Sequence, residues 1–245
     1  MLTQLVDRVR VVEPSTSQGT GLRVVPILGP SHEEPPYLLL GSQTRDHVQV
    51  TEVSESGSVP HLRVTNALDV KLLLLDGQEL VGAKQNRILN TDVLVPAGAT
   101  LTIPVSCVEQ GRWRSISPQF TPGKSASYRT RQAKMERVHA SLKERQAHDA
   151  DQAAVWQEVE ASLRMSDADD SPTRALADAY ARRERELESF RSTLRLPDRT
   201  VGVAVFHGRA FRGIDLFDRE ATLREFWATL LDSYAVDFLG APVDL

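Results

Sequence analysis

One stretch of the chain decides the fold: residues 70–90, which read VKLLLLDGQELVGAKQNRILN. Its first half is a run of leucines that ends in Asp76-Gly77, a dipeptide that favours the tight turn of a β-hairpin. Its second half, residues 80–90, fits another strand, in which Gly82 allows a bulge or a close backbone approach. We expect the strands before and after residues 84–90 to be neighbours, which is the commoner arrangement for sequential strands.

Similar short apolar runs precede this stretch. Gly, Pro, Ser and Asn separate them, which is typical of strands joined by turns. The runs are residues 9–12, 22–28, 37–41, 48–53, 62–66 and 70–75. Residues 1–115 are therefore predicted to form an N-terminal β-rich region, an antiparallel sandwich-like layer or barrel.

Two further regions follow, and the hydrophobic period changes at each boundary. Residues 120–196 are predicted to form three central helices. The first carries an apolar stripe of Met135, Val138 and Leu142, Asp151 can cap the second, and residues 171–173 open the third. Residues 198–245 fit a C-terminal β-hairpin followed by an amphipathic helix. Because a lone hairpin is not stable, we expect one α+β domain over residues 1–245.

The composition excludes several classes of protein. The chain has 245 residues, 41% hydrophobic and 25% charged, which is ordinary for a globular protein. No apolar run approaches the roughly 20 residues that cross a bilayer, and the N-terminal residues lack a signal-peptide core. We therefore expect a soluble cytoplasmic protein without a membrane partner. The single cysteine, Cys107, follows Ile103 and Val105 on one strand face, which predicts a buried, inert thiol.

Four successive polar residues, Lys84 to Arg87, interrupt the apolar pattern of the deciding stretch. Such a conflict between local pattern and environment is typical of functional or strained sites. One interpretation is a polar network that ties strands together. The other is a pocket for an anionic ligand, since Arg binds phosphate bidentately and Lys binds it as a point charge. The residues predicted to bind the ligand are Lys84, Gln85, Asn86, Arg87 and Arg112.

Three carboxylates stand near this segment: Asp76, Glu79 and Glu109. If neighbouring strands bring them together, they are candidates for acid/base catalysis or for holding a divalent cation such as Mg²⁺, Mn²⁺ or Ca²⁺. Glu109 is notable because it continues the apolar face of its strand. The sequence contains no Walker A, Rossmann or zincin motif, so the cofactor and the reaction stay open.

The net charge is −4, but basic residues gather between 112 and 145 and acidic ones between 149 and 170. We interpret the two blocks as solvated helices that attract each other, with a phosphate-binding surface as the alternative. Nucleic-acid binding by the basic helix at 124–145 is a weaker alternative, because few aromatic residues are present to stack on bases. Self-association into a homo-oligomer stays open.

Three segments together resemble a known family: LLDGQELVGAKQNR (74–87), PVSCVEQGRW (104–113) and GIDLF (213–217). They are similar to the bacterial and archaeal domain associated with ADP-ribosylglycohydrolases and rhodanese-phosphatase-superfamily proteins. The resemblance extends from about residue 5 to residue 239. It implies a context of ADP-ribose or nucleotide processing, without an established reaction. Gln78 departs from the family, which often has a second Glu there.

These observations leave three functions open. The first is an enzyme-like pocket for an ADP-ribose or nucleotide derivative, with Asp76, Glu79 and Glu109 as its acid/base or metal-binding groups. The second is a non-catalytic module that uses the same residues to bind such a ligand or a protein partner. The third is nucleic-acid binding. We rank the first two equally and the third well behind.

Overall fold

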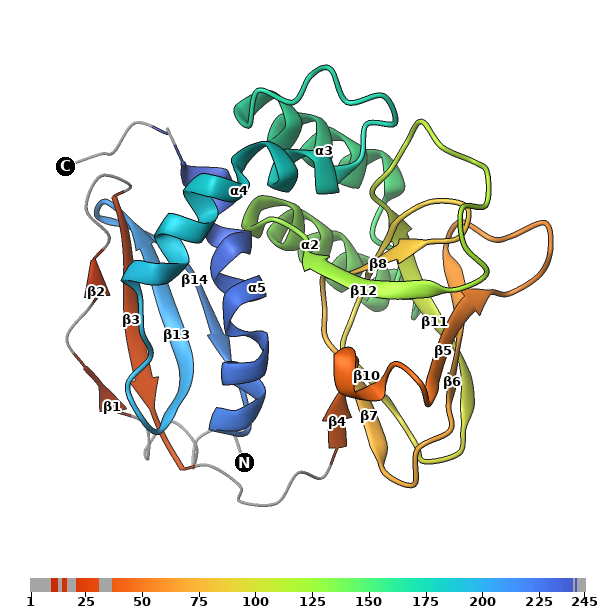
Figure 1. The fold of residues 1–245 in the computed structure, drawn as a ribbon, viewed down its shortest axis with the longest axis horizontal. Coiled ribbons are helices and arrows are strands. Elements are labelled where there is room, and N and C mark those ends of the chain that lie inside the picture. Colours follow the sequence, from red (N-terminus) through yellow and green to blue (C-terminus); the bar gives the residue numbers. More distant parts are fainter. Residues whose placement is uncertain (1–9, 13–14, 17–20, 31–36, 240, 242–245) are drawn as a thin grey trace. The chain divides into compact units, whose positions relative to one another are not determined.

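The computed structural model describes residues 10–12, 15–16, 21–30, 37–239 and 241 (Figure 1). The chain divides into two compact units, residues 1–35 with 183–245 and residues 36–182. Both contain antiparallel strands and helix, so the predicted α+β class is confirmed. The prediction that the chain is one cooperative domain stays a prediction.

The larger unit is built on a closed β-barrel, in which each strand pairs antiparallel with its neighbours. Of the two architectures expected from sequence, the structure has the barrel and not the sandwich-like layer, and closure removes the exposed edges that an open sheet leaves. Around the barrel the order is β11 (Thr100–Cys107), β6 (His61–Asn66), β5 (Val48–Glu52), β12 (Phe120–Ser125), β8 (Gln78–Gly82) and β9 (Arg87–Leu89).

The barrel core comes from alternate residues of its strands. Val48 and Val50 of β5, Leu80 of β8 and Leu89 of β9 belong to one buried apolar cluster. Successive strand residues point to opposite faces, so these positions define which side chains face the interior. A small sheet adds to the same cluster, in which β7 (Lys71–Leu74) pairs parallel with β4 (Tyr37–Leu39) and antiparallel with β10 (Val93–Val95).

The strand predicted over residues 80–90 is two strands, β8 and β9, separated by a turn at residues 83–86. The strands before and after residues 84–90 were predicted to be neighbours, and this prediction is wrong, because β9 lies between β8 and β11. β8 pairs instead with β9, where Glu79 lies opposite Ile88. The run at residues 70–75, in contrast, forms β7 in the small sheet and pairs with neither of them. The turn therefore places the four polar residues at a barrel end.

Three helices follow in the larger unit: α2 (Tyr128–Arg145), α3 (Gln152–Met165) and the start of α4 (Leu176–Thr193). Ser127 caps α2 and Asp151 caps α3, as predicted for Asp151. The third helix begins at Leu176, not at residues 171–173. No helix within the described ranges is long and apolar enough to cross a membrane.

The buried face of α2 is mostly polar, so the predicted apolar stripe is wrong. Met135 is 59% exposed, and only Val138 of that stripe is buried. The residues that α2 buries are Thr130, Lys134, Val138 and Ser141. Hydrogen bonds to partners distant in sequence, described below for Lys134, allow this face to be polar.

The smaller unit is a sheet formed by both ends of the chain. Strand β13 (Thr200–His207) lies between β3 (Leu22–Leu28) and β14 (Ala210–Leu216), and all three are antiparallel. The short β1 (Arg10–Val11) and β2 (Ser15–Thr16) also pair with β3, and α5 (Glu220–Phe238) contacts β13. β1 and β3 thus belong to a different sheet from the other strands of the predicted N-terminal layer. Residue 9 of the predicted 9–12 strand lies outside the described residues.

Candidate functional site at one end of the barrel

The strand directions bring several polar residues to one end of the barrel. β5 and β11 both run antiparallel to β6, and β9 runs against β11. The ends of β5 and β11 and the start of β9 therefore lie at the same end. Glu52 continues the inward row of Val48 and Val50, and Arg87 shares its face with Leu89. The apolar interior thus ends in two charged side chains.

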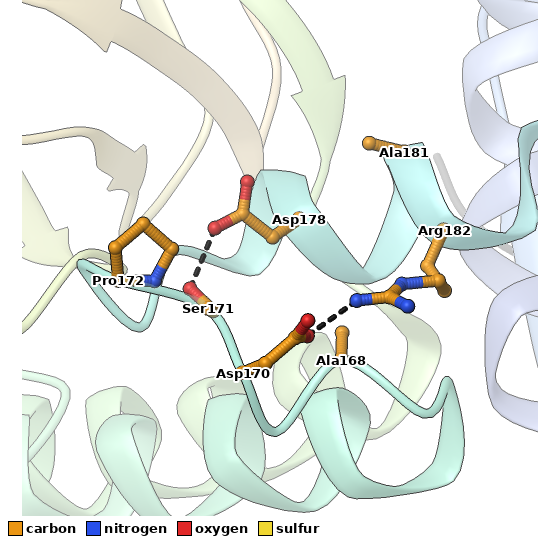
Figure 2. Close-up of a pocket in the computed structure, with 7 residues that line it drawn as sticks. All are labelled: Ala168, Asp170, Ser171, Pro172, Asp178, Ala181 and Arg182. Atoms are coloured by element: carbon orange, nitrogen blue, oxygen red, sulfur yellow. Dashed lines mark hydrogen bonds and ion pairs between the residues drawn. The ribbon is translucent and has the colours of Figure 1, made fainter.

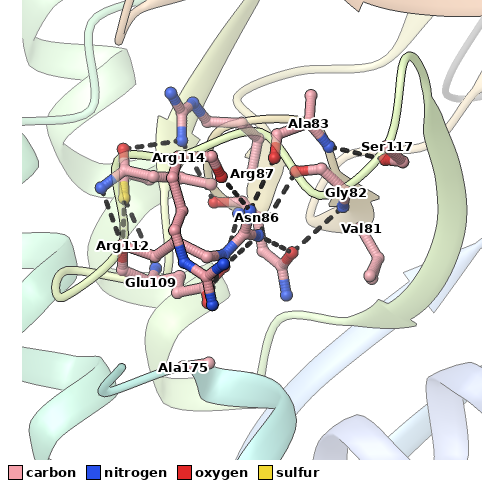
Figure 3. A network of polar contacts seen from close by, with 12 residues as sticks. Val81, Gly82, Ala83, Asn86, Arg87, Glu109, Arg112, Arg114, Ser117 and Ala175 are labelled. Carbon is pink, nitrogen blue, oxygen red and sulfur yellow. Dashed lines mark hydrogen bonds and ion pairs between the residues drawn. The ribbon is translucent and has the colours of Figure 1, made fainter. Parts of the chain in front are cut away.

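The turn at residues 83–86 has an unusual backbone. Ala83 has φ +39°, in the left-handed region that side chains rarely adopt. Gly82 precedes it with φ +130°, and a Cβ there would lie 2.5 Å from Ser117 Oγ. The Ala83 N–H donates to Ser117 Oγ, and the Gly82 N–H donates to Asn86 Oδ1 (Figure 3). Such strain persists only where surrounding contacts hold it.

Arg112 and Glu109 supply most of those contacts. Arg112 Nε donates to Glu109 Oε1 at 2.8 Å and Nη2 donates to Oε2 at 2.5 Å (Figure 3). Its Nη1 also donates to the Ala83 carbonyl at 2.6 Å. Glu109 Oε2 accepts from the Asn86 N–H, so both charges are well paired. Burial raises the pKa of Glu109, but the bonds from Arg112 and Asn86 outweigh it and hold the pKa below its usual value.

Glu79 is joined to this network by Asn86. The Asn86 Nδ2 group donates to Glu79 Oε1 at 3.2 Å, while Asn86 Oδ1 accepts from Arg112. Glu79 is 1% exposed. Its burial raises its pKa from 4.5 to about 7, and the nearby charge of Glu109 acts in the same direction. Glu79 is therefore a carboxyl group that exchanges a proton near neutral pH.

Arg87 is the member whose hydrogen bonding is incomplete. Its Nη1 donates to Gln85 Oε1 at 2.9 Å, and Gln85 in turn donates to the Glu109 carbonyl. Its Nε and Nη2 are buried and have no acceptor in the part of the chain that the structure describes. Burial lowers the pKa of Arg87. The two unpaired groups form the side of the guanidinium that binds an anion bidentately.

Trp113 and Lys84 lie beside Arg87 at the surface. The Trp113 ring is 5.7 Å from Arg87 Cζ and 5.5 Å from Lys84 Nζ, both measured to the ring centroid. Trp113 is 49% exposed. Lys84 Nζ donates to the carbonyls of Glu55 and Ser56 in the loop between β5 and β6. A half-exposed aromatic ring therefore adjoins a fully buried cation.

Asp76 belongs to a different network. It forms an ion pair with the buried Lys134 of α2, which also donates to the Asn90 carbonyl. Asn90 Oδ1 accepts from Ser106 Oγ. Among the described residues no hydrogen bond joins this network to the Glu79–Arg112 network. Of the eight predicted site residues, the structure gathers seven at or beside the barrel end and separates Asp76 from them.

Glu52 and Trp113 were not among the predicted site residues. The signal for Glu52 was present in the sequence, because it continues an apolar row just as Glu109 does. Trp113 carried no such signal, since its position depends on the fold of the loop at residues 108–119. Cys107, at the same end, is 0% exposed, so its predicted burial is confirmed, and burial raises the pKa of its thiol.

A cavity of about 410 Å³ lies elsewhere in the larger unit, at the start of α4 (Figure 2). There Ser171 Oγ donates to Asp178 Oδ2 at 2.5 Å, and Asp170 pairs with Arg182. None of the predicted site residues lines it. Over the described ranges no three His, Cys, Asp or Glu side chains are grouped so that they could hold a metal ion.

The basic block at residues 112–145 is not a continuous exposed surface. Arg112 and Lys134 are buried and paired. Two exposed members face the acidic segment: Arg137 lies 4.0 Å from Asp151, and Arg145 lies 3.3 Å from Asp149. This arrangement agrees with the interpretation of mutually attracting segments.

Together these features define an α+β protein whose closed barrel ends in a buried polar network next to an exposed tryptophan. The chain belongs to the ARPP-1 family, the ARG and Rhodanese-Phosphatase-superfamily-associated Protein domain, whose model matches residues 8–244. The resemblance seen in the sequence is thereby confirmed. No curated protein and no solved structure matches the chain.

Proposed function

We propose that this barrel end binds a phosphorylated ligand of the ADP-ribose or nucleotide kind. The observation that carries the proposal is the buried side of Arg87, whose Nε and Nη2 have no acceptor among the described residues. A buried donor that lacks a partner costs about 1–3 kcal/mol, and more when it is charged. A phosphate oxygen pair would satisfy both donors at once.

Neighbouring groups support this proposal. Lys84 adds a second positive charge next to the same indole ring. Trp113 offers a half-exposed aromatic face, on which a base can stack with a gain of about 1–3 kcal/mol. The family is named for its association with ARG and rhodanese-phosphatase-superfamily proteins, and the resemblance noted in the sequence implies an ADP-ribose or nucleotide context for that association.

If the bound ligand is also processed, Glu79 is the carboxyl group best suited to proton transfer. Its pKa of about 7 lets it carry or release a proton at neutral pH. Asp76 and Glu109, the other two catalytic candidates, are each committed to an ion pair. Binding is nevertheless the function that the geometry supports best, because Glu79 is almost fully buried.

Isothermal titration calorimetry with ADP-ribose, ADP and AMP tests the proposal. We expect the wild-type protein to bind at least one of them and Arg87→Met to bind it at least about tenfold more weakly, since a charge-assisted pair is lost. Arg137→Met removes the same charge from an exposed position on α2 and should bind as the wild type does. Circular dichroism checks that both variants fold. A wild-type protein that binds none of the three, or an Arg87→Met variant that binds normally, would contradict the proposal.

A further inference from the structure

Glu52 is a second buried charge at the barrel end with incomplete hydrogen bonding. Both of its carboxylate oxygens are shielded from solvent and accept no hydrogen bond from any described residue. Its charge raises the pKa of Arg87, so the two groups lie within electrostatic range of each other. They nevertheless form no ion pair. The Glu52 carboxylate, which can only accept hydrogen bonds, and the Arg87 guanidinium, which can only donate them, therefore lie at one end of the barrel without a hydrogen bond between them.

The two groups place opposite demands on a ligand. A simple anion would pair with Arg87 but would be repelled by Glu52, whose oxygens would still lack donors. A neutral polyol would satisfy Glu52 but would leave the charge of Arg87 unbalanced. A ligand that satisfies both carries an anionic acceptor group and neutral hydroxyl donors close together.

The charges and shape around Glu52 narrow the ligand further. Arg87 and Lys84 are two cations against one carboxylate, which favours a ligand with net negative charge over a zwitterion. Three side chains pack against Gly57: a Cβ built there would lie 3.1 Å from Lys84 Cδ, 3.3 Å from Glu52 Oε2 and 3.4 Å from Trp113 Cζ2. The Glu52 carboxylate and the indole ring of Trp113 therefore lie close to the same backbone position. A sugar ring can stack its C–H face on the indole while its hydroxyls donate to the carboxylate.

From this arrangement we infer that the ligand is a phosphorylated sugar whose vicinal hydroxyls donate to Glu52 while its phosphate binds Arg87. This inference rests on the proposed function and adds a residue, Glu52, and a chemical group, the sugar diol. Glu52 is a specificity-determining residue in this account: it selects hydroxylated phosphates over inorganic phosphate.

Calorimetry with ribose 5-phosphate and 2-deoxyribose 5-phosphate tests the inference, because the second sugar lacks one of the paired hydroxyls. We expect the wild-type protein to prefer ribose 5-phosphate by about tenfold or more, as a bond to a charged group is lost. Glu52→Gln should weaken binding of ribose 5-phosphate and abolish the preference. The matched control, Glu55→Gln, removes an exposed charge from the loop that follows β5 and should keep the preference. The melting temperature of Glu52→Gln should stay close to that of the wild type, since no hydrogen bond within the protein is lost.

Several results would overturn the inference. For the wild-type protein these results are equal affinity for the two sugars, or failure to bind either sugar. Tighter binding of serine, which is a zwitterion, than of ribose 5-phosphate would also overturn it. For the variant, the contradicting result is that Glu52→Gln keeps the preference for ribose 5-phosphate. If Glu52→Gln fails to fold, Glu52→Asp, which withdraws the carboxylate while keeping its charge, is expected to lose the preference in the same way. In each of these cases, binding of ADP-ribose that depends on Arg87 would still support the proposed function. Failure of the inference about Glu52 is therefore distinguishable from failure of the proposed function.

Discussion

Arg87 and Arg112 lie at the same barrel end, yet their surroundings differ in a way that separates structure from binding. Arg112 donates to Glu109, to Asn86 and to the carbonyls of the strained turn. Arg87 leaves two donors without an acceptor among the described residues. We therefore attribute a structural role to Arg112 with Glu109 and a binding role to Arg87. Under the proposed function, both interpretations of the polar segment that the sequence left open apply, but to different residues.

This assignment predicts that Glu109→Ala destabilises the fold strongly. The substitution leaves Arg112 buried without its partner, which typically costs about 3–5 kcal/mol. Urea unfolding measures the loss. The double variant Glu109→Leu with Arg112→Met should recover a large part of it, because no charge is left buried and unpaired. A Glu109→Ala protein as stable as the wild type would show that the pair does not hold the turn.

Glu79 predicts a pH dependence of stability. Its pKa is about 7 in the folded chain against an ordinary 4.5, so the folded state binds the proton more tightly. Its contribution to the free energy of unfolding is therefore fully present below pH 4.5 and is lost as the pH rises through about 7, by about 3 kcal/mol in total. Glu79→Gln removes this contribution. The wild-type minus variant difference, measured by urea unfolding from pH 4 to 8, should fall over that window, and a flat difference would contradict the raised pKa.

At the scale of helices and strands, the sequence predicted those features that depend on residues close to one another in the chain. Most strands were found because turn residues separate short apolar runs, as for β3, whose bounds match the prediction at residues 22–28. The turn at residues 83–86 was missed because Ala83 adopts a left-handed conformation without being a glycine. The buried face of α2 was missed because Lys134 is paired with Asp76, which lies 58 residues away. No local signal reports such a partner.

The polar face of α2 gives a prediction of its own. Lys134→Met should lower stability by about 1–3 kcal/mol, since Asp76 and the Asn90 carbonyl both lose a donor. The cost stays moderate because the side chain of Asp76 is 31% exposed and water can solvate it. Adding Asp76→Asn should restore part of the loss in thermal unfolding. A single variant more stable than the wild type would show that the ion pair contributes nothing.

At the scale of the whole molecule, pairing between distant segments decides the architecture. Barrel closure depends on β12 pairing with both β5 and β8, and the other sheet depends on β13 pairing with β3. The pattern of apolar residues locates such strands but does not determine which of them pair. The sequence therefore could not distinguish a β-sandwich from a β-barrel. The candidate site lies wholly within residues 36–182, although the family match covers residues 8–244.

The prediction of a single domain can be tested by unfolding. Trp113 lies in the larger unit and Trp227 in the smaller one. If the chain unfolds as one domain, urea transitions followed by either tryptophan, with the other tryptophans replaced by Phe, coincide. A ligand at about 100 times its Kd should then shift both by about 2.7 kcal/mol. Two separate transitions would show that the units unfold independently.

The fluorescence of Trp113 alone, in a Trp156→Phe, Trp227→Phe protein titrated with ADP-ribose, tests whether the ligand binds at Arg87 beneath Trp113. We expect a saturable change in emission with the same Kd as calorimetry, and we expect this change to be lost when Arg87→Met is added. Calorimetric binding that leaves the Trp113 emission unchanged would place the ligand elsewhere and would contradict binding at the barrel end.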